Sequence, residues 1–340
     1  MTTDELILYT KKLTAIGGVS SNEEEIRRFL LNELNNCCDR TETDAARNIF
    51  GFIGCADKSA KTLLLEAHMD RIGLVVSEIR SDGTVLFSDA GGIDKRILPY
   101  SEVEFLNEGK RINGIIVPDK ADGQTDESSL CIFTGLSEKE LKNSIKIGSK
   151  AILLSKFSRL CGNVISSGAL DNRAGTAALI NVLQTVNKSR LKFNIIVLFA
   201  VGEELGLHGA FSAAEHIRAD AAVVVDVTHG MTHDTKDESE VFPLGCGAVI
   251  CRGPNLHYGY TKKFIALAKQ LGIPYRIEVA AGSSGTDAWA LQASGAGIPS
   301  VLISIPLKYM HTNVEVADAG DIQSVSELIC RAAEGGTNLD

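Results

Sequence analysis

The chain has 340 residues, of which 44% are hydrophobic and 23% are charged, an ordinary balance for a globular protein with one large domain or two smaller ones. Its formal net charge of −9 argues against nucleic acid or an anionic membrane as the main partner. No apolar stretch is long enough to cross a bilayer, and the N-terminus lacks the clean apolar core of a secretory signal, so we expect a cytoplasmic protein.

The first 35 residues predict two helices separated by a turn. Residues 4–15 carry apolar side chains at helical spacing, and this spacing continues from Ile26 to Leu34. Ser21 or Asn22 could cap the second helix, because glutamates follow in what would be its first turn.

Continuous apolar runs and helical patterns alternate along much of the chain. Apolar runs that predict strands covered on both faces occupy residues 62–66, 193–201, 221–227 and 300–305. Helical spacing of apolar residues predicts helices over 174–186, 205–217 and 261–271. This alternation predicts an α/β fold with a mixed, largely parallel sheet flanked by helices.

Residues 72–162 differ from the rest of the chain. Short alternating segments are broken there by glycine, aspartate and asparagine, and the one evident helical pattern covers residues 137–144. Because the α/β pattern resumes immediately afterwards, we interpret 72–162 as a small β-rich domain inserted into an α/β domain made of residues 1–71 and 163–340.

The eight cysteines are scattered, and none belongs to a Cys-x-x-Cys pair. Disulfide frameworks are typical of short secreted chains, which this chain does not resemble. We therefore expect reduced, mostly buried thiols and no thiolate metal site.

Ligand-type residues follow the predicted strands or open a predicted helix. They are His68, Asp70, Asp171, Glu203, Glu204, Asp226 and His311. Each has an ordinary explanation when taken alone: Asp171, for example, could simply cap a helix. Active sites of open α/β sheets gather at the carboxyl ends of strands, so five such ends together predict a functional site.

Two imidazoles and five carboxylates suit a pair of divalent cations such as Zn²⁺, Co²⁺ or Mn²⁺. One carboxylate must bridge two ions that lie about 3.5–4 Å apart, and such a pair supports amide hydrolysis. Glu203 and Glu204 point apart, so one can bind metal while the other faces the substrate. Asp70, two residues after His68, can hold the far nitrogen of that imidazole.

Several short motifs carry a specific resemblance. They are Gly18-Val19-Ser20, Ala67-His68-Met69-Asp70, Ala169-Leu170-Asp171-Asn172-Arg173, Glu203-Glu204-Leu205-Gly206-Leu207, Asp226-Val227-Thr228, Gly285-Thr286-Asp287-Ala288, and Ile303-Ser304-Ile305-Pro306 leading to His311. With these motifs, the chain resembles the M42 family of metallo-aminopeptidases over nearly its whole length. That family includes the glutamyl and tetrahedral aminopeptidases and proteins labelled endoglucanase M.

The resemblance implies a zinc-peptidase-like fold with two divalent ions per subunit, Zn²⁺ or Co²⁺ and less readily Mn²⁺. It implies that His68 and Asp226 hold one ion, that Glu204 and His311 hold the other, and that Asp171 bridges them. It further implies that Glu203 is the general base and acid that activates a metal-bridging water, and that Asp70 orients His68.

The implied activity is removal of the N-terminal residue from peptides with a free N-terminus. For the inserted segment, the resemblance implies a β-barrel-like domain for oligomerisation, with dimers that build a tetrahedral dodecamer. The chain departs from the family pattern at Arg71, at Lys308 and at Thr312-Asn313. No ligand is lost there, so we expect metal binding to persist and any difference from the family to lie in substrate preference or assembly.

Three alternatives stay open at this point. A related two-metal hydrolase, such as a deacylase or a dipeptidase, would use the same ligands. A glycosidase, suggested by the endoglucanase label, needs two carboxylates and no metal, and it leaves the histidines unexplained. A repurposed scaffold without activity would have to keep a costly cluster of charges.

Overall fold

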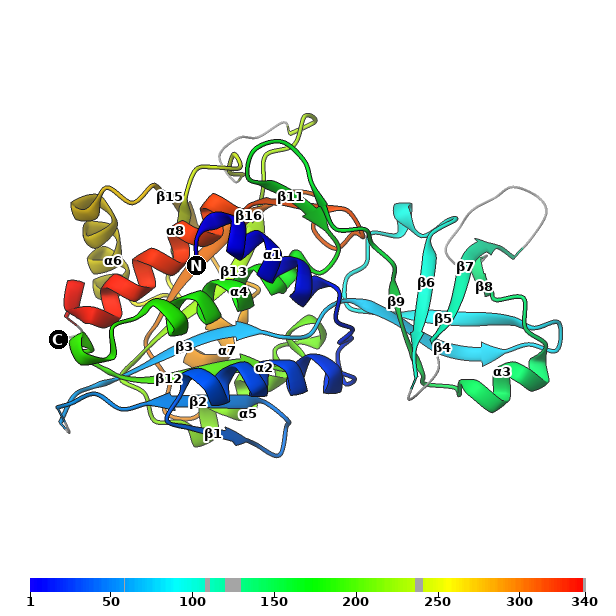
Figure 1. The fold of residues 1–340 in the computed structure, drawn as a ribbon, viewed down its shortest axis with the longest axis horizontal. Helices are drawn as coiled ribbons and strands as arrows, with labels where there is room; N and C mark the ends of the chain where they lie inside the picture. The colour runs from blue at the N-terminus through cyan, green and yellow to red at the C-terminus, as the bar shows by residue number, and fades with distance from the viewer. Residues whose placement is uncertain (58, 108–110, 120–129, 236–240, 339–340) are drawn as a thin grey trace.

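The computed structural model describes residues 1–57, 59–107, 111–119, 130–235 and 241–338. The chain has a mixed α/β fold, as the sequence predicts, and it forms two lobes (Figure 1). One lobe holds an eight-stranded sheet between helices, and the other is a closed β-barrel. Within the described ranges, no helix has the length and apolar character needed to span a membrane.

The large sheet has the strand order β1-β2-β12-β3-β13-β16-β14-β15. Its strands are β1 (Arg40–Thr43), β2 (Ile49–Ile53), β3 (Thr62–His68), β12 (Asn194–Ala200), β13 (Ala221–His229), β14 (Ala248–Arg252), β15 (Tyr275–Val279) and β16 (Ser300–Leu307). The four central strands, β12, β3, β13 and β16, are parallel to one another. β2 joins β12 and β14 joins β16 in antiparallel pairs, so the sheet is mixed.

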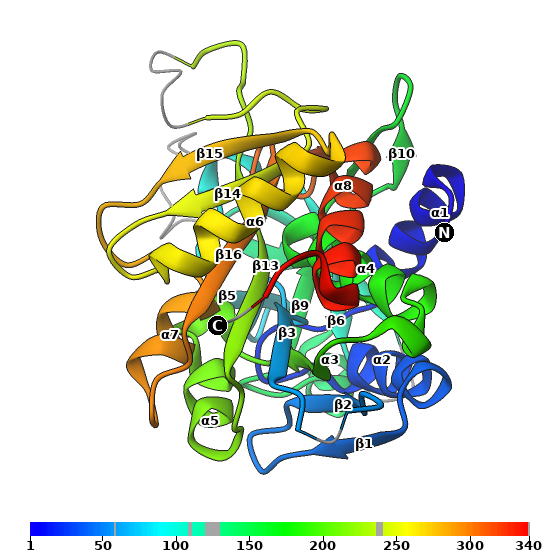
Figure 2. The same ribbon diagram turned by 90° about the vertical axis from the view of Figure 1, so that its left-hand side faces the viewer.

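Helices cover both faces of this sheet (Figure 2). One face packs against α1 (Thr3–Thr14), α2 (Glu24–Cys37), α4 (Leu170–Thr185), α6 (Tyr258–Leu271) and α8 (Ala319–Arg331). The other face packs against α5 (His208–His216) and α7 (Asp287–Ala293). Burial on both sides explains why the central strands read as unbroken apolar runs, since Leu64 and Leu65 enter opposite cores.

Residues between β3 and α4 form the second lobe and two strands of a short linking sheet, whose third strand comes from near the C-terminus. Six strands close the barrel in the order β4-β5-β8-β7-β6-β9, with a core of their own. Its elements are β4 (Gly73–Ile79), β5 (Thr84–Ala90), β6 (Glu102–Leu106), β7 (Ile112–Pro118), β8 (Leu130–Phe133), α3 (Glu138–Ser144) and β9 (Lys150–Leu153). The linking sheet pairs β11 with both of its neighbours, and its strands are β10 (Ser158–Arg159), β11 (Val164–Ser167) and β17 (Glu315–Asp318).

Some predicted boundaries need correction. The predicted caps Ser21 and Asn22 do not open α2, whose N-cap is Glu23 without a capping side chain. The strand predicted over 221–227 continues to His229, because it pairs with β16 as far as Leu307. Asp226, which the predicted range already includes, therefore lies three residues before the end of the strand.

The eight cysteines are all unpaired, and five of them are buried, in agreement with the expectation of reduced thiols. The cytoplasmic location expected from the sequence stays a prediction.

We expect the sheet core to dominate stability. Leu65 is fully buried in β3, so Leu65→Ala should lower the free energy of unfolding by about 2–5 kcal/mol through lost burial and a residual cavity. Urea denaturation followed by circular dichroism measures this change. The matched control is Leu8→Ala, whose side chain is 60% exposed and whose loss should cost less than about 0.5 kcal/mol. Equal effects for the two variants would contradict this account of the core.

Candidate metal centre

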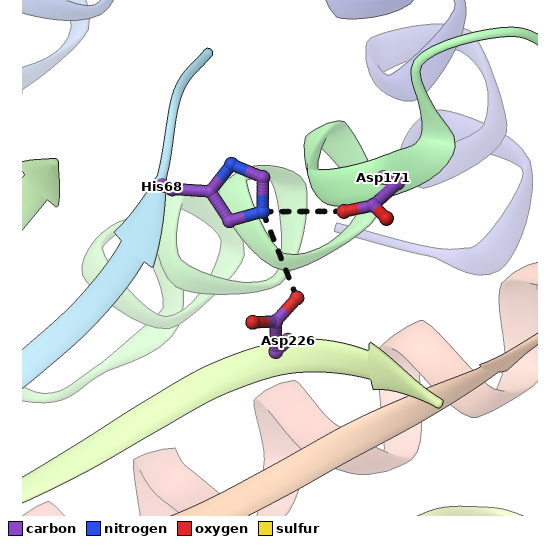
Figure 3. Close-up of side chains that lie close together, drawn as sticks. All are labelled: His68, Asp171 and Asp226. Carbon is purple, nitrogen blue, oxygen red and sulfur yellow. Dashed lines mark hydrogen bonds and ion pairs between the residues drawn. The ribbon is translucent and has the colours of Figure 1, made fainter. Parts of the chain in front are cut away.

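The predicted ligand residues converge at the carboxyl ends of the central strands of the large sheet. His68 is the last residue of β3, Glu203 and Glu204 follow β12 in a 3₁₀ turn, and Asp226 lies in β13. β12, β3 and β13 are adjacent and parallel, so their carboxyl ends lie side by side. His311 arrives from the loop after β16, and Asp171 lies in the first turn of α4, beside His68 and Asp226 (Figure 3).

These side chains form two groups that share Asp171. The first group is His68, Asp171 and Asp226, and the second is Asp171, Glu204 and His311. In each group, one ligand atom per residue lies within 4.8 Å of the others. Each group is thus compact enough to surround one ion.

Asp171 directs its two oxygens to different histidines. Its Oδ1 lies 3.2 Å from His68 Nε2, and its Oδ2 lies 3.4 Å from His311 Nε2. His68 Nε2 also lies 3.7 Å from Asp226 Oδ1 (Figure 3), and His311 Nε2 lies 3.4 Å from Glu204 Oε2. Ligands that are each about 2 Å from a common ion have separations of this size.

Glu203 stands outside both groups but close to them. Its Oε2 lies 3.9 Å from His68 Nε2, and its side chain lines the same cleft while remaining 11% exposed. Glu203 and Glu204 thus occupy different positions around the site, as their adjacency predicts.

Asp70 is fully buried and braces several parts of the centre. Its Oδ1 lies 3.4 Å from His68 Nδ1, and its oxygens accept hydrogen bonds from the backbone N–H groups of Glu203 (3.1 Å) and Glu204 (3.3 Å). The Ser20 hydroxyl donates to its Oδ2 at 2.6 Å. One carboxylate therefore holds both an imidazole and the turn that carries the two glutamates.

Sequence reasoning missed Glu315 at the start of β17. This buried residue accepts backbone hydrogen bonds from Asp171 N (3.2 Å) and His311 N (3.0 Å), so it positions one ligand of each group. Burial raises the pKa of Glu315 to about 8, and the positive charge of the buried Arg71 opposes this rise. No local pattern around Glu315 could have indicated this role, because its partners come from two other segments.

Sequence reasoning also missed a buried carboxyl pair beneath the centre, Glu66 in β3 and Asp287 at the start of α7. Burial raises the pKa of Asp287 to about 7 and the pKa of Glu66 well above its ordinary value. Burial of both carboxyls next to each other therefore favours their protonated forms. A glutamate inside the apolar run Thr62-Leu63-Leu64-Leu65-Glu66-Ala67 was the available signal, since charged residues are rarely fully buried.

Crowded charges perturb the titration of the ligands. Burial disfavours a charge on His311, but hydrogen bonding to Asp171 and the charge of Glu204 outweigh it and raise its pKa to about 9. Burial raises the pKa of Glu204 to about 8 and that of Glu203 to about 10. Burial would also raise the pKa of Asp171, but both histidines hold it below its ordinary value.

The donor set fits divalent cations. Glu204 Oε1 is buried and has no hydrogen-bond partner among the described residues. Several carboxylates also lie close to two imidazoles in a largely buried region. A bound cation would reduce the repulsion among these carboxylates. Imidazole nitrogen and carboxylate oxygen without thiolate are ligands that Zn²⁺, Co²⁺ and Mn²⁺ accept.

A cleft of about 550 Å³ opens onto this centre. Asp171, Glu203, Glu204, Asp226 and His311 line its floor, so a bound molecule would touch both groups of ligands. Its size suits a small ligand or the end of a peptide.

Known proteins are similar to this chain in sequence and in fold. A family model for the M42 glutamyl aminopeptidases matches residues 48–328. The lysyl aminopeptidase of Pyrococcus furiosus is 30% identical over 94% of this chain and 94% of its own length. An aminopeptidase structure from the archaeon Desulfurococcus kamchatkensis has a TM-score of 0.92 at 28% identity, covering 98% of this chain and 96% of its own. The Pyrococcus horikoshii TET1 peptidase has a TM-score of 0.84 at 30% identity, covering 96% of this chain and 99% of its own. That peptidase can assemble into a tetrahedron or a large octahedral shell.

Metal binding should release protons. With a pKa of about 9, His311 carries a proton near pH 7 that must leave before its Nε2 can bind an ion. Calorimetric titration of chelator-treated protein with Mn²⁺, which has little affinity for thiols, should give heats that vary with the ionisation enthalpy of the buffer. Affinity should rise between about pH 7 and pH 8.5, because the proton is lost as pH approaches the raised pKa. His311→Gln should release fewer protons, and heats independent of the buffer would contradict this titration.

Proposed function

Because this chain belongs to the M42 glutamyl aminopeptidase family, we propose that it is a two-metal aminopeptidase that removes the N-terminal residue from peptides. The family and the names of its relatives make the chain a peptidase of the hydrolase class. The observation that carries the two-metal proposal is the placement of the two oxygens of Asp171 against two different histidines.

In this proposal the two groups of side chains each hold one divalent ion. His68 and Asp226 hold the first, Glu204 and His311 hold the second, and Asp171 belongs to both. Bound ions of this kind polarise a carbonyl and lower the pKa of water. Zn²⁺, Co²⁺ and Mn²⁺ all suit the ligands.

Glu203 moves the proton. Its carboxylate takes a proton from the attacking water and returns it to the leaving amine, which is general base and then general acid catalysis. Its position supports this role, since it lines the cleft beside His68 but belongs to neither ligand group. Burial raises its pKa to about 10, and nearby cations would lower this value and favour the ionised base.

Two further residues keep the centre in place. Asp70 orients His68 through Nδ1 and also holds the turn of Glu203 and Glu204. Such outer partners fix the ring orientation of a metal-binding histidine. The backbone carbonyl of Gly92, 2.7 Å from His311 Nδ1, has the same position relative to the second histidine.

We propose that the chain also self-associates. The TET1 peptidase, with a TM-score of 0.84, assembles into closed shells. In this chain, residues 72–162 would form an inserted oligomerisation domain, and residues 1–71 and 163–340 would form the catalytic domain. The barrel supports this division, because it has a separate core and carries exposed apolar side chains such as Phe133 and Ile147. A dimer and a tetrahedral dodecamer are the assemblies we propose.

Substrate panels test the activity. Aminoacyl-p-nitroanilides with a free amine should be hydrolysed, a chelator should abolish the reaction, and Zn²⁺ or Co²⁺ should restore it. N-acetylated versions of the same substrates should be hydrolysed poorly, because the blocked amine cannot bind at the metal centre. Preference for the acetylated substrates would indicate a deacylase instead, and chelator-resistant cleavage of β-glucans would indicate a glycosidase.

Glu203→Gln should separate metal binding from chemistry. The amide keeps the shape of the side chain but cannot accept the proton, so kcat should fall by about 10²–10⁴-fold. Metal content, measured by mass spectrometry of the purified variant, should stay at the wild-type level because Glu203 lies outside both groups of ligands. A variant that keeps both its metal and full activity would refute the role of Glu203.

A further inference from the structure

One wall of the cleft carries a charged side chain that the proposed mechanism does not use. Glu278 lies in β15, the edge strand of the large sheet, and lines the cleft together with residues of β13 and β16. It is the only carboxylate of the described lining outside the set formed by the metal ligands and Glu203. His229 is the other ionisable side chain of this wall.

A hydrogen bond joins Glu278 to β13, the strand that also carries Asp226. The hydroxyl of Thr228 donates to Glu278 Oε1 at 2.5 Å, although two strands separate β13 from β15 in the sheet. Thr228 is buried and follows Asp226 by two positions, so both side chains leave the same face of β13 about 7 Å apart. The Glu278 carboxylate is thus held at a fixed distance from the first group of metal ligands.

No lysine or arginine among the described lining residues of the cleft faces the charge of Glu278. The apolar part of the lining comes from Leu207, Val227, Leu302 and Met310. A partly buried carboxylate in a cleft that also offers apolar side chains is complementary to a long aliphatic side chain with a terminal cation.

We propose that this wall receives the side chain of the substrate's N-terminal residue, and that Glu278 selects lysine and arginine there. The inference rests on the proposed aminopeptidase function. With the free amine held at the metal ligands, the first side chain must enter the adjoining space, and Glu278 forms a charge-assisted hydrogen bond with its ammonium or guanidinium group. The same charge repels N-terminal glutamate and aspartate.

The test measures kcat/KM at about pH 8 for lysyl, arginyl, leucyl and glutamyl p-nitroanilides. We expect the wild-type protein to favour the lysyl and arginyl substrates over the glutamyl one. Glu278→Gln should lower kcat/KM for the basic substrates by about 10- to 100-fold, as expected for loss of a charge-assisted hydrogen bond, and change the leucyl value less than about threefold. The matched control is Glu42→Gln in β1, the opposite edge strand, which should leave kcat/KM unchanged for every substrate.

Hydrolysis of the leucyl substrate shows in every variant whether the protein is folded and its metal centre intact. A change in selectivity can therefore be told apart from a general loss of activity. Glu278→Asp, which keeps the charge, should retain most of the preference for basic substrates. Equal losses for leucyl and lysyl substrates in Glu278→Gln, or unchanged selectivity, would overturn the role of Glu278. A change that depends on the second residue, detected by comparing Lys-Leu with Leu-Lys dipeptides, would also overturn it. No activity on any free-amine substrate in the wild-type protein would instead refute the aminopeptidase function, and this inference with it.

Discussion

The sharing of Asp171 between two histidines is the contact on which the site depends. Its two oxygens face His68 and His311, which come from opposite ends of the chain, and Asp226 and Glu204 complete the two groups. These carboxylates and imidazoles lie within a few ångströms of one another in a largely dry region. Such a cluster is costly without a cation, because burial and like charges both oppose ionised carboxylates. The arrangement is therefore best understood as a site built around positive charge.

The rest of the fold keeps that cluster rigid. The parallel centre of the sheet brings the ends of β3 and β12 and the end portion of β13 to one edge, and helices bury both faces. Buried carboxylates then fix the loops at that edge. Asp70 holds the turn after β12, and Glu315 holds the backbones of Asp171 and His311. Positions enforced by such buried hydrogen bonds suit a centre in which small displacements would separate the ligands.

The proposed metal ligands and the proposed specificity residue lie in different parts of the sheet. The proposed ligands lie on or beside the central strands and α4, which pack in the middle of the lobe that holds the large sheet. Glu278, by contrast, lies on the edge strand β15, lines the cleft and accepts a hydrogen bond from Thr228. The family model is named for glutamyl aminopeptidase, and one relative is named lysyl aminopeptidase. An edge strand can change its side chains with little effect on the core, so substrate preference can vary there.

The sequence by itself determined the α/β alternation, the central strands and the seven candidate site residues, because periodicity and strand ends are local properties of the chain. It also indicated that Glu203 and Glu204 would separate, since adjacent side chains point apart. Only the tertiary structure decided that the strand of Asp226 extends to His229, that Glu315 accepts a hydrogen bond from Asp171, 144 positions away, and that Glu278 meets Thr228 across two strands. Those contacts depend on strand order and on the path of loops, and neither leaves a pattern in neighbouring residues.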